Sequence, residues 1–417
     1  MKQKIRNYID KHQDELFQTI QELVQIETVV GNEFEGQQYI KQKYKEIGLD
    51  VHEFEPCKEE LMRHEAFVDS GISFTNRNNI IGIHKGQGDG KSLTLHGHMD
   101  VVSAEPVENW SINPWSGEIK GNKLYGRGSA DMKSGLVANW FALKTLIDLD
   151  YPIAGDVQLH CVIEEEAGGG GGALACLEKG YRTDGYISSE PHQLQMTISH
   201  AGIMYFRVKV TGKTAHAGLA HEGVNAIAKM YPIFQALEQL GKWRGEHVRF
   251  DLYEQGSGQS VHLNTGVMQA GDWVSTVPGE AVLECRIGFI PGESRKQMKQ
   301  LVHDTVFQAI ADDDWFEKHP PIIEWFGWST EPWYQDPQHP FVTTFKRTTE
   351  QVLKHPINVI GRASGNDARF TRYYDMPGLC FGPIGENMHG PDENVDLASV
   401  IDVTNVFAHF IIDWTES

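Results

Sequence analysis

The sequence predicts an α/β protein in which a mostly parallel-sheet domain is interrupted by a smaller inserted α+β domain of the ferredoxin-like type. Three observations lead to this prediction. Short apolar runs alternate with helical patterns up to about residue 190, as expected for a parallel sheet whose strands are joined by helices. Strictly alternating strand patterns begin near residue 200, and the earlier pattern returns near residue 330. We therefore expect one domain from 1–199 and 330–417, with 200–329 inserted.

The elements of the larger domain follow from local periodicity. Apolar residues recur at helical spacing in the first 50 or so residues, for example at Leu16, Ile20 and Leu23. Further helices are expected at 132–149, 170–178 and 398–414. Short apolar runs predict strands at 49–54, 79–84, 92–96, 156–163, 184–189 and 378–381.

The insertion has a different pattern. Apolar and polar residues alternate in the expected strands 203–210, 260–268, 281–289 and 321–326. Helical patterns cover 224–240 and 293–311. The resulting order, β-α-β-β-α-β, is that of the ferredoxin-like split motif.

Charge and composition exclude several classes of protein. The chain has 57 acidic and 37 basic residues and a net charge of −20, which disfavours nucleic acids and anionic membranes as partners. The charged N-terminus does not resemble a signal peptide, and no apolar run of about 20 residues predicts a membrane span. Five scattered cysteines fit reduced thiols, so we expect a cytoplasmic protein.

The first chemical signal follows an expected strand. His98 and Asp100 lie directly after the apolar run 92–96. The carboxyl ends of parallel strands are where α/β proteins place their sites. A histidine and an aspartate at this spacing can supply a metal ligand and the carboxylate that orients it. The alternative is a polar turn with a capping aspartate.

Two more carboxylate signals follow. Asp131 precedes an expected helix, where it can cap the helix, bridge two metal ions, or do both. The triplet 164–166 consists of three glutamates at the end of an apolar strand, and metal ions would offset their mutual repulsion. One glutamate can then bind metal while its neighbour faces a water molecule as general base. The alternative is an exposed acidic turn. The glycines that follow do not match a phosphate-binding loop.

The last two signals are Glu190, at the end of the strand 184–189, and His389, in a loop after the strand 378–381. They complete a set of two histidines and several carboxylates. Such mixed ligands suit zinc, with cobalt or manganese as substitutes.

The ordered segments HGHMD, GRGSADMK, EEE with its glycines, SEP and MHGPDE resemble the family of acetylornithine deacetylase, succinyl-diaminopimelate desuccinylase, aminoacylase and glutamate carboxypeptidase. The resemblance covers nearly the whole chain and implies two zinc ions bridged by Asp131. It assigns one ion to His98, Asp131 and Glu190, and the other to Asp131, Glu166 and His389. It also implies that Glu165 is the general base and that Asp100 orients His98.

The same resemblance implies roles for the insertion as a lid and as the interface of a homodimer. His216, or His221 as the second choice, would reach the partner's site and help to hold the oxyanion. Arg286 would pair with a substrate carboxylate, for which the guanidinium fork is suited. Ser275 stands where many relatives have a substrate-contacting asparagine, and Asp367 with Arg369 would help to shape the site.

The segment 273–278, WVSTVP, looks most like the acetylornithine deacetylase-like branch, which includes deformylases and other deacylases. We therefore expect hydrolysis of the amide bond of a small N-acyl amino acid or N-acyl amine. A dipeptidase or carboxypeptidase of the same family is the alternative, because its chemistry is identical. A third possibility is an inactive ligand-binding relative, against which the intact ligand set and Glu165 argue.

Overall fold

The computed structural model describes residues 2–253, 258–362 and 364–417, which form two compact units. Unit 1 consists of Met1–Ile198, Gln335–Ile360 and Asn366–Ser417, and unit 2 of Ser199–Tyr334 and Gly361–Gly365. The sequence placed the insertion at 200–329, whereas unit 2 runs on to Tyr334 and takes in a short returning segment. Unit 1 is thus assembled from both ends of the chain.

The large sheet has nine strands, in the order β1-β2-β6-β3-β7-β15-β8-β13, with β14 beside β8. Their bounds are β1 Asp50–Phe54, β2 Asn79–His84, β3 Leu93–His98, β6 Val157–Val162, β7 Tyr186–Ser188, β8 Met196–His200, β13 Trp333–Tyr334, β14 Val359–Arg362 and β15 Gly378–Cys380. The four central strands, β6, β3, β7 and β15, run parallel. This confirms the predicted α/β class, and antiparallel pairs extend the sheet on both sides.

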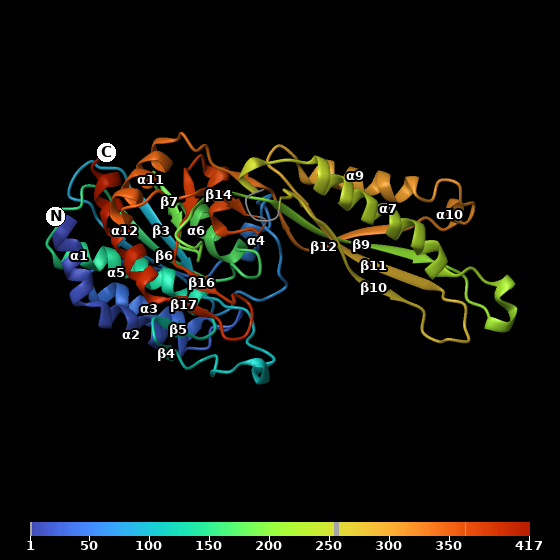
Figure 1. Cartoon of the computed structure of the whole chain (residues 1–417), viewed down its shortest axis with the longest axis horizontal. Coiled ribbons are helices and arrows are strands. Elements are labelled where there is room, and N and C mark those ends of the chain that lie inside the picture. The colour runs from blue at the N-terminus through green and yellow to red at the C-terminus, as the bar shows by residue number, and fades with distance from the viewer. Residues whose placement is uncertain (1, 254–257, 363) are drawn as a thin grey trace. The chain divides into compact units, whose positions relative to one another are not determined.

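The helices of unit 1 cover this sheet (Figure 1). Their bounds are α1 Lys2–Lys11, α2 Gln13–Val24, α3 Phe34–Glu46, α4 Lys58–Leu61, α5 Ser134–Asp148, α6 Ala175–Glu178, α11 Pro340–Leu353 and α12 Leu397–Thr415. Helix α5 is buried on nearly all sides because it lies between β3 and the helices α2 and α12. By length and hydropathy α12 could cross a membrane, but 78% of its apolar window is buried inside the protein, as is common for a core helix.

A small antiparallel sheet lies in unit 1, in the order β16-β17-β5-β4. Its strands are β4 Ile119–Lys120, β5 Lys123–Tyr125, β16 Gly385–Glu386 and β17 Asn394–Asp396. Asn394 in β17 pairs with Tyr125 in β5. This pairing brings the loop before β17 beside the loop after β5, although more than 250 residues separate them in the sequence.

Unit 2 has the predicted order of elements, with an antiparallel sheet β10-β11-β9-β12. Its elements are β9 Gly202–Thr211, α7 Ala226–His247, β10 Leu263–Ala270, β11 Glu280–Phe289, α9 Arg295–Gln308, α10 Trp315–Lys318 and β12 Ile322–Thr330. Strands β9 and β11 alternate between buried and less buried residues. The buried side chains pack against α7 and α9, which lie side by side along the sheet (Figure 1).

Candidate metal centre

The central parallel strands bring several polar side chains to one edge of the sheet. His98 is the last residue of β3, the triplet 164–166 follows β6, and Glu190 follows β7. Because parallel strands end at the same edge, these residues lie close together although they are far apart in the sequence. Asp131, from the loop before α5, and His389, from the loop between β16 and β17, complete the cluster.

Asp131 lies between two histidines and faces each with a different oxygen. Its Oδ1 is 3.2 Å from Nε2 of His98, and its Oδ2 is 3.4 Å from Nε2 of His389. His98 is wholly buried, whereas the side chain of His389 is 53% exposed. A carboxylate in this position can bind a cation through each oxygen, which is the arrangement needed for two neighbouring metal ions.

His98 is oriented by the main chain. Its Nδ1 lies 2.8 Å from the backbone carbonyl oxygen of Asp100 but 3.7 Å from the nearer oxygen of the Asp100 carboxylate. That contact leaves Nε2 directed at Asp131 and, at 3.7 Å, at Glu190. The tautomer that binds metal through Nε2 is therefore favoured.

The Asp100 carboxylate has a different role, which the sequence did not reveal. It accepts the backbone N–H of Glu165 at 3.2 Å and that of Glu166 at 3.0 Å. The segment that carries His98 therefore also holds the two glutamates in place.

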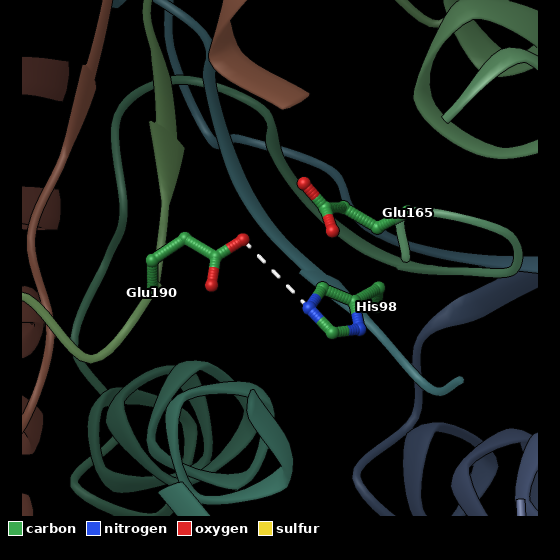
Figure 2. A group of neighbouring side chains, drawn as sticks. All are labelled: His98, Glu165 and Glu190. Atoms are coloured by element: carbon green, nitrogen blue, oxygen red, sulfur yellow. Dashed lines mark ion pairs between the residues drawn. The ribbon is translucent and has the colours of Figure 1, made fainter. Parts of the chain in front are cut away.

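The carboxylates and His98 form two groups that could hold metal ions. One comprises His98, Glu165 and Glu190, and the other His98, Asp131 and Glu166, with ligand atoms within 4.8 Å of one another. In Figure 2, Glu190 directs its carboxylate at a ring nitrogen of His98 and Glu165 approaches from another side. Nε2 of His389 lies 3.1 Å from Glu166. The structure thus brings together all five predicted ligands and Glu165, with Glu165 close enough to be a ligand itself.

The electrostatics of the cluster favour a bound cation. Burial, and then the charge of nearby carboxylates, raise the pKa of Glu165 and of Glu190 well above the usual range. Burial opposes a charged His98, yet the carboxylates of Asp131 and Glu190 raise its pKa well above the usual value. Buried oxygens of Glu166 and Glu190 also lack a hydrogen-bond partner among the described residues. Because buried polar atoms are nearly always paired, these residues fit metal ions.

Glu164, the first residue of the triplet, was assigned no role from the sequence. It is wholly buried, accepts a hydrogen bond from Ser70 at 2.7 Å, and lies 3.5 Å from Arg77, which pairs with Glu33. The glycine run makes room for it. A Cβ atom on Gly171 would lie 2.4 Å from the ring of Phe74 and 2.6 Å from the Glu164 carboxylate. The run is therefore needed for close packing behind the site.

Asp367 lies beneath the cluster and not on its surface. It is wholly buried, and its Oδ2 is 3.0 Å from Nε2 of the equally buried His96 in β3. Arg369 donates a hydrogen bond to the backbone oxygen of Gly168 at 2.5 Å. These contacts brace the end of the sheet, which is consistent with the expected role of Asp367 and Arg369 in shaping the site.

The remaining predicted residues belong to unit 2. His216 is exposed and accepts the backbone N–H of Gly218 through Nδ1 at 3.0 Å. Its segment pairs with that of the exposed Ser275, whose backbone oxygen accepts the N–H of Ala217 at 2.8 Å. Arg286 is half-buried in β11, opposite Asn264 and Tyr205. The second candidate, His221, is exposed a few residues beyond His216.

Comparison with protein families gives one match. The sequence model of peptidase family M20/M25/M40 matches residues 94–413. This range contains every residue of the cluster.

Similar proteins are known by sequence and by structure. The chain is 26% identical to N-formyl-4-amino-5-aminomethyl-2-methylpyrimidine deformylase of Halalkalibacterium halodurans, over 98% of this chain and 96% of that protein. It is 24% identical to succinyl-diaminopimelate desuccinylase of Leptothrix cholodnii, over 93% and 96%. A tripeptidase from Staphylococcus aureus shares the fold, with a TM-score of 0.76 at 22% identity over 97% and 99% of the two chains.

Proposed function

The chain belongs to peptidase family M20/M25/M40, and from this we propose that it is a metal-dependent hydrolase that deacylates a small N-acyl amino acid or N-acyl amine. The observation that carries the proposal is the position of Asp131 between His98 and His389, with Glu165, Glu166 and Glu190 around it. An inactive ligand-binding relative would have no need to keep both a complete ligand set and a base.

Deacylation is favoured over peptide hydrolysis by the relatives in sequence. A deformylase and a desuccinylase each align with more than nine-tenths of this chain, and both names describe removal of an acyl group. The tripeptidase supports only the shared fold, at 22% identity. Peptide hydrolysis remains the second candidate because the same chemistry cleaves both kinds of amide bond.

The residues proposed to hold two metal ions are those that surround Asp131. His98, Asp131 and Glu190 would hold one ion, and Asp131, Glu166 and His389 the other. Mixed histidine and carboxylate ligands favour zinc, with cobalt or manganese as substitutes. When bound, two such ions would polarise the carbonyl of the scissile amide and acidify a water molecule.

Glu165 is the proposed general base. Its pKa is raised by burial and by neighbouring carboxylates, which suits a group that takes a proton from water and passes it to the leaving nitrogen. The carboxylate of Asp100 accepts the backbone N–H of Glu165 at 3.2 Å, and the backbone oxygen of Asp100 contacts His98. We therefore propose that Asp100 positions both Glu165 and His98.

We propose a homodimer that uses unit 2, in which His216 completes the partner's site by holding the oxyanion. Several large apolar side chains near this histidine are exposed, as at a protein interface: Trp273 is 69%, Val274 92% and Leu219 47% exposed. Arg286 and Ser275, from the same unit, are proposed to contact the substrate. A cytoplasmic location is proposed because none of the five cysteines, all of which the structure describes, forms a disulfide.

A substrate panel tests the proposed function. Purified protein loaded with zinc, cobalt or manganese is offered N-formyl, N-acetyl and N-succinyl amino acids, N-formyl amines and dipeptides, and amine release is measured. Release from acylated compounds supports deacylation, whereas cleavage of dipeptides alone selects the peptidase alternative. Absence of cleavage together with absence of bound metal overturns the proposal.

A further inference from the structure

Glu393 links two loops that each carry a residue of the metal cluster. It lies four residues after His389 and is wholly buried. Its side chain does not face the cluster but turns to the loop that ends in Asp131. No role follows for it from the sequence alone.

Both carboxylate oxygens of Glu393 are used by that loop. Oε1 accepts the backbone N–H groups of Ala130 and Asp131, each at 3.0 Å. Oε2 accepts the N–H of Gly128 at 3.1 Å and a hydrogen bond from Arg127 at 2.5 Å. One buried carboxylate thus satisfies three main-chain donors and one guanidinium, which is close to its full capacity.

Arg127 completes the link in the other direction. Its side chain donates a hydrogen bond to the backbone oxygen of Gly390 at 3.2 Å, next to His389. The guanidinium also lies over the ring of Trp110, 5.1 Å from its centre. Each loop therefore holds the other through a side chain, and the spacing between Asp131 and His389 depends on this pair.

The two histidines of the cluster differ in how they are held. His98 ends β3 and is buried, whereas His389 is half exposed in an irregular loop and has a positive φ of 62°. Other contacts also hold this loop: Asp392 accepts hydrogen bonds from the exposed Ser111, and the backbone oxygen of Glu393 accepts the N–H of Gly126 at 2.9 Å. Loss of the buried pair should consequently disturb His389 more than His98.

We propose that Glu393 and Arg127 are positioning residues that set the distance between Asp131 and His389, and so control the affinity of the metal ion that those two residues share with Glu166. The inference rests on the proposed function, because it assumes that the cluster binds two ions. It predicts unequal effects on the two ions, because His98 ends β3 and Glu190 follows β7, whereas His389 lies in the loop that Glu393 anchors.

The test is a metal-binding measurement on Glu393→Gln with a matched control. Glu293→Gln is the control because Glu293 also pairs with a buried arginine, Arg244, at 2.8 Å, and also accepts a backbone N–H, from Ile290, at 3.0 Å. Each metal-free protein is titrated with zinc against a competing chelator, and bound metal is counted by mass spectrometry. Thermal unfolding of the metal-free proteins checks that both variants fold.

We expect Glu393→Gln to bind one ion as the wild type does and the other about 10- to 100-fold more weakly, the usual effect of losing an outer hydrogen-bond partner. Glu293→Gln should bind both ions as the wild type does. Equal affinities in Glu393→Gln and wild type overturn the inference, and so does equal weakening of both ions. If Glu393→Gln does not fold, Glu393→Asp replaces it, and failure of both to fold makes the pair purely structural. A wild type that binds fewer than two ions overturns the proposed two-ion site on which the inference rests, whereas the substrate panel tests the proposed function separately.

Discussion

The backbone N–H of Glu165 donates a hydrogen bond to the carboxylate of Asp100 over 3.2 Å. Since His98 in turn contacts the backbone oxygen of Asp100 at 2.8 Å, one residue fixes a proposed ligand and the proposed base together. The geometry of the site therefore depends on a group that need not touch metal or substrate.

Replacing Asp100 with Asn should weaken both stability and activity. Asn has one acceptor oxygen, whereas Asp100 accepts from both Glu165 and Glu166, so one buried N–H loses its partner. We expect the free energy of unfolding in urea to fall by about 1–3 kcal/mol, the usual cost of an unpaired buried group. Asp89→Asn, at an exposed position, is the control. Unchanged stability of Asp100→Asn would show that these two hydrogen bonds contribute little.

Replacing Glu165 with Gln should remove activity without removing metal. A glutamine cannot accept the proton, so we expect kcat to fall about 10²-fold or more, the range for a general acid–base. Metal content, counted by mass spectrometry, should stay at the wild-type value. Because Glu165 also lies within ligand distance of His98 and Glu190, loss of a metal ion in this variant would instead identify it as a ligand. Glu108→Gln, at an exposed position, is the control for changes in activity or metal content that arise during preparation of the protein.

Mixing two inactive variants should restore part of the activity if His216 acts in the partner's site. In a mixed dimer of Glu165→Gln and His216→Ala, one of the two sites has its own Glu165 and the partner's intact histidine. Random exchange of subunits in a symmetric dimer then gives about a quarter of wild-type activity. His221→Ala, mixed in the same way, distinguishes the two candidate histidines. No recovery, with exchange verified by mass spectrometry of tagged subunits, would place each site within a single chain.

Stability should fall in mild acid because of His160. Burial, and then the charge of His96, hold its pKa well below the usual value of about 6.5 in the folded protein. In mild acid the unfolded chain therefore takes up a proton that the folded protein cannot. This residue does not lower the free energy of unfolding above about pH 6.5, but it lowers it progressively as the pH falls below that value. His160→Phe, which suits a site lined by Tyr181 and Tyr186, should reduce the slope of unfolding free energy against pH between about 5 and 7. An unchanged slope would mean that other buried histidines cause the loss of stability in mild acid.

The sheet and its polar edge could be predicted from the sequence because both follow from patterns of residues that are close together in the chain. Runs such as 92–96 and 156–163 have the period of strands, and His98 and the glutamate triplet come directly after them. The helix expected at 170–178 is present as a π-helical turn, Gly170–Leu174, that continues into α6, and the glycines of this turn allow close packing. The segment 361–365, which joins unit 2, is too short to show any period.

The supporting contacts could not be predicted, because their partners are backbone groups far away in the sequence. Glu393 binds N–H groups about 260 residues earlier, and neither end shows a pattern that points to the other. The buried group of Glu164, Arg77 and Glu33 likewise joins three distant segments. The sequence identified the segment that contains Glu393 and the triplet that contains Glu164 as parts of the site. The roles of these two residues follow only from their contacts in the folded protein.

The construction of unit 1 from both ends of the chain has a consequence during synthesis on the ribosome. Strand β15 lies between β7 and β8 in the sheet but is translated after all of unit 2, and His389 and Glu393 follow it. After Glu190, the nascent chain therefore grows by 199 residues (389 − 190) before His389 completes the cluster. Under the proposed ligand assignment, hydrolytic competence arises only near the end of translation, so a product truncated before His389 is expected to be inert.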